Sequence, residues 1–143
     1  MPLLNESASG VYVIAATPFT EEGELDLQSA DRMVDFYLER GADGLTLLGV
    51  MGEAPKLTAE ESIAFVGRIV RRVKGRGEII VGVSSPGLAS MKALAASAMD
   101  LGAAGVMVAP PSHLRTDDQI LSYFETVAEA LGPTPFALQD YPL

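Results

Sequence analysis

The sequence contains no cysteine and only one histidine among its 143 residues. A chain without cysteine can form no disulfide bond, carries no thiolate nucleophile and builds no thiolate metal site. The lone histidine, His113, also excludes a two-histidine zinc site within one chain. We therefore expect no metal centre.

Basic residues are scarce, because ten Lys and Arg stand against nineteen Asp and Glu and give a formal net charge of −9. A nucleic-acid groove needs a basic face, so we expect no nucleic-acid partner. An acidic balance of this kind is ordinary for a soluble protein and identifies no partner by itself.

Long hydrophobic runs are also missing. The apolar run Val11–Ala16 is too short for a membrane span or for the core of a secretion signal, and no basic segment precedes it. The expected compartment is the cytoplasm, without membrane contact.

What the sequence does contain is a regular series of short apolar runs. They are rich in Val, Ile and Leu and do not alternate with polar residues, which is typical of parallel strands buried on both faces. The five predicted strands are Val11–Ala16, Leu45–Leu48, Ile79–Val83, Val106–Ala109 and Phe136–Gln139.

Four segments with helical periodicity lie between these strands. Asp26 can cap the first, and Thr58 with Glu61 has the spacing of a capping box at the start of the second. Glycines at the ends of the first and fourth can adopt conformations that stop a helix. The expected helices are about Leu27–Arg40, from Thr58 to Val73, about Ser90–Leu101, and from Thr116 to Gly132.

The helical spacing assigns apolar side chains to the inward faces of these helices. The third helix is rich in alanine and suits close packing on a sheet. The residues predicted to face inward on the others are Met33, Val34, Phe36, Tyr37, Leu38, Ile63, Phe65, Val66, Ile69, Val70, Val73, Ile120, Leu121, Tyr123, Phe124, Val127 and Leu131.

The resulting β-α-β-α-β-α-β-α-β order has no linker, so residues 1–143 are assigned to one α/β domain. An open doubly wound sheet and a (β/α)8 barrel both fit this order. The segment after the first strand, Ala16–Thr20, lacks the G-x-G-x-x-G of a dinucleotide-binding fold, and no P-loop occurs. The missing nucleotide signatures favour a barrel, of which this chain would supply the first four βα units and strand five.

Three loop segments carry a family resemblance. They are Ala16-Thr17-Pro18-Phe19, Gly49-Val50-Met51-Gly52-Glu53, and Leu138-Gln139-Asp140-Tyr141-Pro142. Together with Leu57-Thr58-x-x-Glu61, this ordering resembles the dihydrodipicolinate synthase / N-acetylneuraminate lyase family, from about Gly10 to the last residue.

The resemblance implies a TIM barrel and a homo-oligomer, a tetramer or a dimer. It also implies a cofactor-free class I aldolase that acts on pyruvate or a related 2-oxo acid. In that chemistry a lysine on the sixth strand forms a Schiff base with the substrate, and the iminium is the electron sink for making or breaking a C–C bond. The loop after strand two holds the substrate carboxylate, and a tyrosine on strand five moves protons.

The chain departs from that pattern at several positions. Its lysines are Lys56, Lys74 and Lys92, and none matches the Schiff-base lysine, so we expect the chain alone to be inactive. Val50 and Met51 stand where the family usually has two hydroxyl residues. Gln139 stands at the position of the family tyrosine, and an amide cannot shuttle a proton near neutral pH. These departures favour a substrate other than those of the synthase or the sialic-acid lyase.

The expected substrate-binding residues are Gly49, Val50, Met51, Thr17 and Ser112, with Gln139 at the catalytic position of the family. The loop after strand two would present backbone N–H groups to a carboxylate, with Glu53 in a structural role. The hydroxyl of Thr17 is expected to support this backbone. Gln139 would contact substrate if strand five points it inward, and would otherwise be a buried amide.

Other polar residues have simpler interpretations. A loop histidine such as His113 is more often solvated than catalytic, although it lies on the functional face. Lys56 is expected to be a solvent-facing loop charge, and Asp140 to bond a local backbone amide. Tyr141, beside Pro142, is expected to have left the strand.

The leading hypothesis is thus the N-terminal half of an aldolase-type lyase for a small 2-oxo acid. The alternative is a non-catalytic half-barrel that binds a small acid or assembles with copies of itself, because the edges of an open parallel sheet leave backbone groups unpaired.

Overall fold

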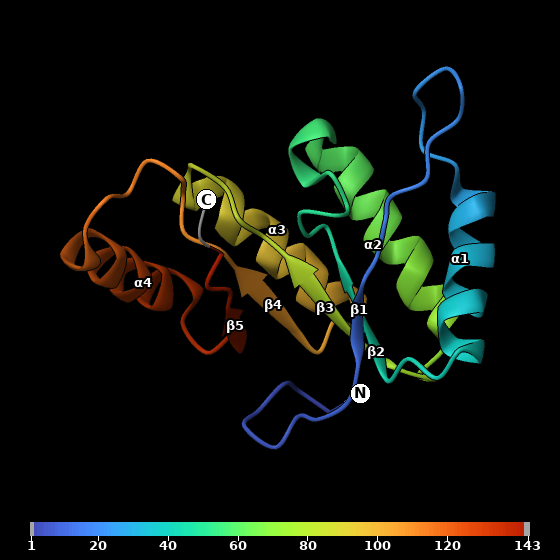
Figure 1. Ribbon diagram of the computed structural model, residues 1–143, viewed down its shortest axis with the longest axis horizontal. Helices are drawn as coiled ribbons and strands as arrows, with labels where there is room; N and C mark the ends of the chain where they lie inside the picture. Colours follow the sequence, from blue (N-terminus) through green and yellow to red (C-terminus); the bar gives the residue numbers. More distant parts are fainter. Residues whose placement is uncertain (1, 142–143) are drawn as a thin grey trace.

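Strands and helices alternate along the whole chain in the computed structural model, which describes residues 2–141 (Figure 1). The order is β1 (Tyr12–Ile14), α1 (Leu27–Glu39), β2 (Gly44–Leu47), the short 3-10 helix η1 (Ala54–Lys56), α2 (Ala59–Val73), β3 (Glu78–Gly82), α3 (Leu88–Leu101), β4 (Gly105–Val108), α4 (Asp117–Leu131) and β5 (Phe136–Leu138). The five strands and four helices predicted from the sequence are therefore confirmed, with bounds that differ by one to a few residues.

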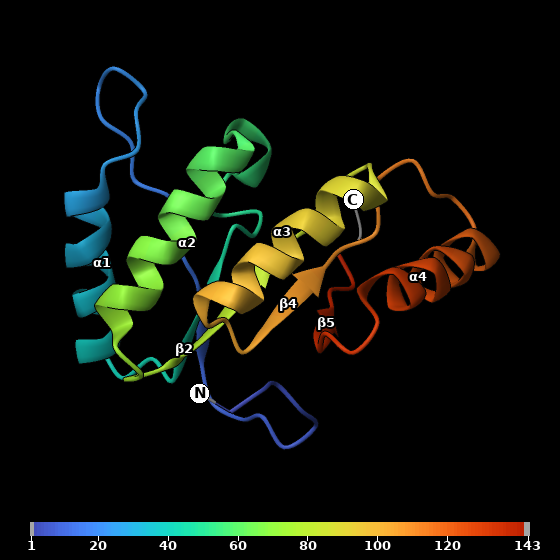
Figure 2. The same ribbon diagram turned by 180° about the vertical axis from the view of Figure 1, so that it is seen from behind.

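All five strands are parallel and pair in chain order, β1-β2-β3-β4-β5. The strands lie in front of the helices in Figure 1, and the helices lie in front of the strands in Figure 2, so the four helices cover one face of the sheet. A doubly wound sheet would reverse its strand order and carry helices on both faces. The observed arrangement is instead that of successive units of a (β/α)8 barrel.

The hydrophobic core lies between the sheet and this helix layer. Its largest fully buried side chains come from β2, β3, β4, α1, α2 and α3. They include Leu45, Leu47, Phe65, Ile69, Ile79 and Met91. Burial of such side chains is the main favourable term in folding.

The helix ends follow the predicted signals. Asp26 accepts a hydrogen bond from the Ser29 amide at 2.9 Å, and Thr58 and Glu61 form both bonds of the capping box. Thr116 forms a second capping box with Gln119 at the start of α4. Gly41, just after α1, has φ of +90°, a conformation that glycine adopts without steric cost.

Three predictions about the inward helix faces are wrong. Phe36 is 52% exposed and its ring lies beneath the Arg40 guanidinium, 5.2 Å from the ring centre. Ile63 is 38% exposed beside η1, a short helix that the periodicity did not indicate. Leu121 is 60% exposed because no described element packs on that side of α4. Spacing identifies the apolar stripe of a helix, whereas burial also needs a neighbour to cover it.

Within residues 2–141, helices cover one face of the sheet only, as in the barrel that the sequence favours. β2 and β3 are nearly continuously buried, yet their second face carries no helix within residues 2–141. That face is the one that looks toward the axis of a barrel, where side chains of the strands pack on one another. We call it the inner face.

Candidate functional site

The strand register decides which residues lie on the inner face. Paired residues of neighbouring strands point to the same side, and successive residues alternate. Leu45, Leu47, Val106 and Val108 belong to the helix-covered core. Alternation therefore assigns to the inner face Tyr12 and Ile14 of β1, Gly44 and Thr46 of β2, Glu78, Ile80 and Gly82 of β3, Gly105 and Met107 of β4, and Ala137 of β5.

The lower end of the inner face, where the strands begin, carries a hydrogen-bonded polar pair, and Leu4 packs nearby against Gly105. The Tyr12 phenol donates a hydrogen bond to the Glu78 carboxylate. Gly44 lies between them, and a Cβ there would come within 2.6 Å of the Tyr12 ring. The carboxylate and burial raise the pKa of Tyr12 to about 12, because both disfavour a second negative charge. The Tyr12 phenol therefore keeps its proton near neutral pH.

The loop after β2 lies at the opposite end, where the active sites of these barrels are found. Leu48 and Glu53 bracket it, and both have left-handed backbone with φ of +55° and +53°. The Gly52 amide donates to the Gly49 carbonyl oxygen at 3.0 Å and closes a tight turn over Val50 and Met51. Within residues 2–141, the amides of Val50 and Met51 donate to no backbone or side-chain oxygen. The turn thus offers two adjacent N–H groups to a ligand.

The neighbouring strands hold this turn in place. The buried Thr17 hydroxyl, just beyond β1, donates to the Gly52 carbonyl oxygen at 2.6 Å. A Cβ on Gly52 would lie 3.2 Å from the Ala15 carbonyl oxygen, and a Cβ on Gly82 would collide with the Leu48 carbonyl oxygen. Close backbone approach therefore requires both glycines, and Thr17 supports the loop backbone as predicted.

Apolar side chains surround the turn. Ile14 Cγ2 and Met107 Cε lie 3.2 and 3.6 Å from the position that a Gly49 Cβ would occupy. β1 and β4 are separated by two strands, so these side chains converge on the end of β2 from both sides. Val50 and Met51 are 53% and 65% exposed, and Ile14 is 38% exposed. We call Ile14, Val50, Met51 and Met107 the apolar rim.

Gln139 continues β5 by one residue. Its amide donates to the Val108 carbonyl oxygen at 2.9 Å, which extends the ladder beyond Leu138. Alternation then puts Gln139 on the same side as Ala137, the inner face. Asp140 and Tyr141 are exposed, and Pro142 lies outside the described residues.

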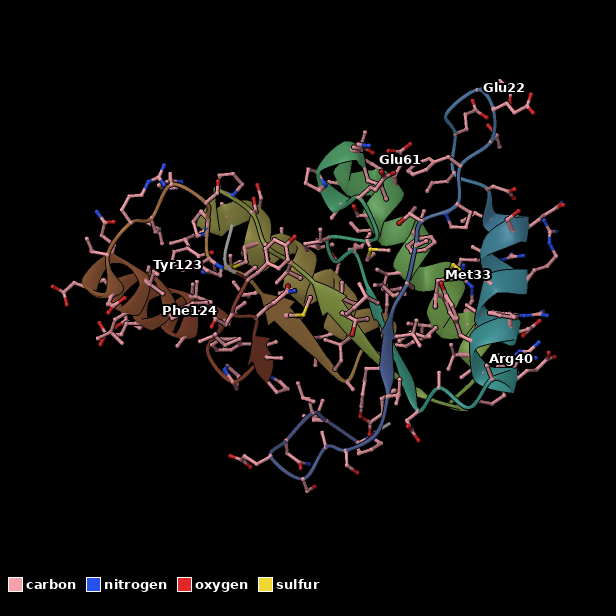
Figure 3. The ribbon with its side chains drawn as sticks, in the orientation of Figure 1. Glu22, Met33, Arg40, Glu61, Tyr123 and Phe124 are labelled. Atoms are coloured by element: carbon pink, nitrogen blue, oxygen red, sulfur yellow. The ribbon has the colours of Figure 1, made fainter. Side chains whose placement is uncertain are left out.

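The loop after β4 contributes two exposed side chains, Ser112 and His113. They line a cavity of about 280 Å³ together with Ser84, Ser85 and Tyr123. Figure 3 shows Tyr123 on the side of α4 nearer the sheet, and burial raises the pKa of its phenol. The structure therefore groups Ser112 and His113 with the β3–α3 loop.

Glu53 and Lys56 form a local ion pair, with Lys56 Nζ 2.9 Å from Glu53 Oε1. Both side chains are largely exposed, and the pair spans η1. Glu53 thus shapes the chain beyond the turn, and Lys56 is the solvent-facing charge that the sequence predicted.

The largest cavity near the loop, about 490 Å³, lies on the helix side between α2 and α3. All the side chains that line it are uncharged, among them Leu57, Ser62, Ser84 and Ser90. Such a lining supplies no charged partner for an anionic ligand, whereas the turn from Gly49 to Gly52 supplies two free amides. We therefore place the candidate site at the upper end of the inner face.

The described residues contain no cluster of histidine, aspartate and glutamate side chains arranged to hold a metal ion. No helix within residues 2–141 has the length and apolar character needed to cross a membrane. Among the turn and the inner-face strand positions, the polar groups available at the site are thus the backbone amides of the turn and Gln139, because Thr46 is buried.

Sequence reasoning missed Ile14 and Met107 as neighbours of the loop. Both lie in apolar runs, where periodicity does not distinguish the two faces of a strand. Their place on the inner face follows from the strand register, which pairs Ile14 with Thr46 and Met107 with Gly82.

Comparison with known proteins agrees with this geometry. The model of the dihydrodipicolinate synthetase family matches residues 7–142. A crystal structure of dihydrodipicolinate synthase from Rhodopseudomonas palustris is 50% identical, with a TM-score of 0.94 over 99% of this chain and 47% of that one. L-2-keto-3-deoxyarabonate dehydratase from Azospirillum brasilense is 35% identical over 93% of this chain and 44% of its own length.

A third relative is YagE, a prophage protein of this family from E. coli K12, solved in complex with pyruvate. It is 29% identical, with a TM-score of 0.83 over 93% of this chain and 45% of that one. The chain thus spans less than half the length of each of these proteins and corresponds to the N-terminal half of their TIM barrel. With its five parallel strands, four helices and the loop after β2, the chain belongs to the dihydrodipicolinate synthetase family.

Proposed function

We propose that these residues form the carboxylate-binding half of a class I aldolase-type enzyme that acts on pyruvate or a related 2-oxo acid. The observation that carries the proposal is the turn from Gly49 to Gly52, which has two unpaired amides in a row. Backbone N–H groups in a tight turn form a concave site for an anion. The turn stands at the end of the barrel that carries active sites in this fold.

The nucleophile in this proposal is the primary amine of a lysine that lies outside residues 1–143 of the full-length protein. Lys56, Lys74 and Lys92 belong to η1, to the end of α2 and to α3, away from the inner face. The amine adds to the C2 carbonyl of the 2-oxo acid and water leaves, which gives an iminium ion. The amides of Val50 and Met51 hold the carboxylate during this step.

Gln139 in this scheme orients the substrate through its amide, because an amide does not titrate near neutral pH. Ser112 and Thr17 have separate tasks. Thr17 keeps the turn in place, and Ser112 lines the entrance near the end of β4. The protein is expected to need no cofactor.

Borohydride trapping tests the proposal on the full-length product of the gene that encodes these residues. Borohydride delivers hydride to C2 of the iminium and fixes the acid to the lysine as a secondary amine. Mass spectrometry should detect a pyruvate adduct on one peptide beyond Leu143. Absence of any adduct at saturating pyruvate would contradict the proposed aldolase chemistry.

A pair of substitutions at Thr17 tests the role of the turn. Thr17→Val removes the hydroxyl that donates to Gly52, whereas Thr17→Ser keeps it. We expect Thr17→Val to raise the pyruvate concentration needed for half-maximal trapping by about tenfold, the effect of one lost buried hydrogen bond. Thr17→Ser should stay close to the unmodified protein. If both variants needed the same pyruvate concentration for half-maximal trapping, the turn would not be the carboxylate-binding site.

A specific observation also favours a second candidate, a half-barrel that assembles with another copy. Within residues 2–141, β1 and β5 pair with no strand at their outer edges, and on the β5 side Leu121 and Leu138 are 60% and 55% exposed. Such edges and apolar patches favour association. Light scattering of purified residues 1–143 should then give the mass of a dimer or larger, and a monomer would exclude this candidate. We expect the full-length protein to be a homo-oligomer as well.

A further inference from the structure

We propose that the apolar rim makes the site selective for 2-oxo acids with an aliphatic carbon chain over those with a hydroxylated one. This inference rests on the proposed function, since it concerns the part of the same substrate that extends beyond C2. It names the side chains that contact that part: Ile14, Val50, Met51 and Met107.

The free amides of the turn lie close to apolar side chains. Val50 and Met51 carry the two free amides, so a carboxylate bound there brings the rest of the acid against neighbouring side chains. Those neighbours converge at Gly49, where Ile14 and Met107 lie 3.2 and 3.6 Å from the position of a Cβ. Gly49, which has no side chain, leaves the room that Ile14 and Met107 fill. The carbon chain of the acid therefore meets methyl and thioether groups.

The strand positions of the inner face offer few polar side chains to a ligand. Above the Tyr12–Glu78 pair, the inner-face positions of the described strands are aliphatic, glycine or alanine, apart from Thr46. Thr46 is 4% exposed, so its hydroxyl has little access to a ligand. Gln139, which continues β5, adds one polar side chain on this face, and the other polar side chains at this end belong to loops, among them Ser112. A hydroxylated chain would lose hydrogen bonds to water without regaining them all, which disfavours its binding.

The exposure of Val50 and Met51 also favours contact with a ligand. Val50 and Met51 are among the most exposed large apolar side chains of the chain, and they belong to a turn held in place by Thr17 and two glycines. Apolar side chains fixed in exposed positions at a binding site contribute affinity when a ligand covers them. One methylene group in contact with such a surface changes affinity by about fourfold.

The test compares two acids of equal size on the full-length protein. 2-Oxobutanoate ends in a methyl group, and 3-hydroxypyruvate has a hydroxyl in its place. Half-maximal borohydride trapping should need at least about fourfold less 2-oxobutanoate. Val50→Thr and Met51→Gln exchange apolar for polar groups of similar size and should each lower this ratio by about threefold or more.

The matched control is Val11→Thr, the same substitution at a 62% exposed valine that lies at the opposite end of β1. It should leave the ratio unchanged, and because the ratio is compared between variants, the different carbonyl reactivities of the two acids cancel. Trapping of pyruvate without a preference for 2-oxobutanoate, or with ratios that Val50→Thr and Met51→Gln do not move, would overturn the inference alone. Failure to trap pyruvate, 2-oxobutanoate or 3-hydroxypyruvate would overturn the proposed Schiff-base function and the inference with it.

Discussion

The α1–α2 side of the sheet and the α4–β5 side are built from similar amphipathic helices, yet they are packed differently. α2 buries Ser62, Phe65, Val66, Gly67, Ile69 and Val73. α4 has the same length and buries only Val127 and Leu131. Figure 3 shows Phe124 of α4 at the end of the molecule opposite α1. The contrast follows from position, because α2 contacts a helix on each side, α1 and α3, whereas within residues 2–141 the only helix that α4 packs against is α3. α1 has a helix neighbour on one side as well, and it too buries only two residues, Ala30 and Val34.

Ion pairs strengthen the same contrast. Arg68 donates two hydrogen bonds to Asp31, at 2.8 and 2.6 Å, and joins α2 to α1. Asp35 on α1 accepts from Arg72 and, at 3.2 Å, from Arg76. Among residues 2–141 no ion pair joins α4 to α3. The α1–α2 side therefore combines a buried apolar seam with a charged outer seam.

The largest effect is expected where the packing is densest. Phe65→Ala should lower the free energy of unfolding by about 3–5 kcal/mol, because it opens a cavity at a fully buried position. Leu121→Ala, on the exposed face of α4, should change it by less than about 0.5 kcal/mol. Urea unfolding of the purified protein measures both. Similar losses at the two positions would mean that α4 is as well packed as α2.

Hydrogen exchange sharpens the comparison without any substitution. The amides of α4 should exchange at least about tenfold faster than those of α2, because local opening exposes few buried groups there. Mass spectrometry of peptides from the two helices checks this. Equal protection would show that the two sides unfold as one cooperative unit.

The two capping boxes provide a matched pair of substitutions. Thr58→Ala and Thr116→Ala each remove the same type of cap, worth about 1 kcal/mol. We expect Thr58→Ala to lower the global free energy of unfolding by that amount. Thr116→Ala should act chiefly by speeding exchange in α4, with a smaller global effect. The reverse order of global effects would contradict the proposed difference.

The smallest effect concerns pH. Hydrogen bonds from Arg68 lower the pKa of the Asp31 carboxyl below its ordinary value of 3.8. A carboxyl with a lowered pKa in the folded state adds stability above its unfolded pKa, and this stability disappears as pH falls through the folded value. Asp31→Asn should therefore be slightly less stable than the unmodified protein at pH 7, and the difference should shrink as pH falls below 3.8 and through the lowered pKa of the folded state. Urea titrations at pH 7 and below pH 3.8 test this, with the exposed Asp140→Asn as the control expected to show no difference.

The sequence predicted the helices and strands well, and the buried faces of the helices less well. Capping residues, glycines and apolar runs act locally, so Thr58, Gly41 and the run Leu45–Leu48 could be assigned correctly. Phe36 and Leu121 could not, because their exposure depends on what packs beside them. The candidate loop was found by its residues, whereas its neighbours Ile14 and Met107 come from strands that are far apart in the chain.

The sequence by itself determined the order of strands and helices, their caps and the family. Each of these depends on residue types at short spacing, which is where local backbone preferences act. Only the tertiary structure decided that Ile14 and Met107 meet at Gly49, that Gly82 makes room for Leu48, and that one sheet face stays open. Those features arise from strand register and from contacts between distant residues, which no local pattern records.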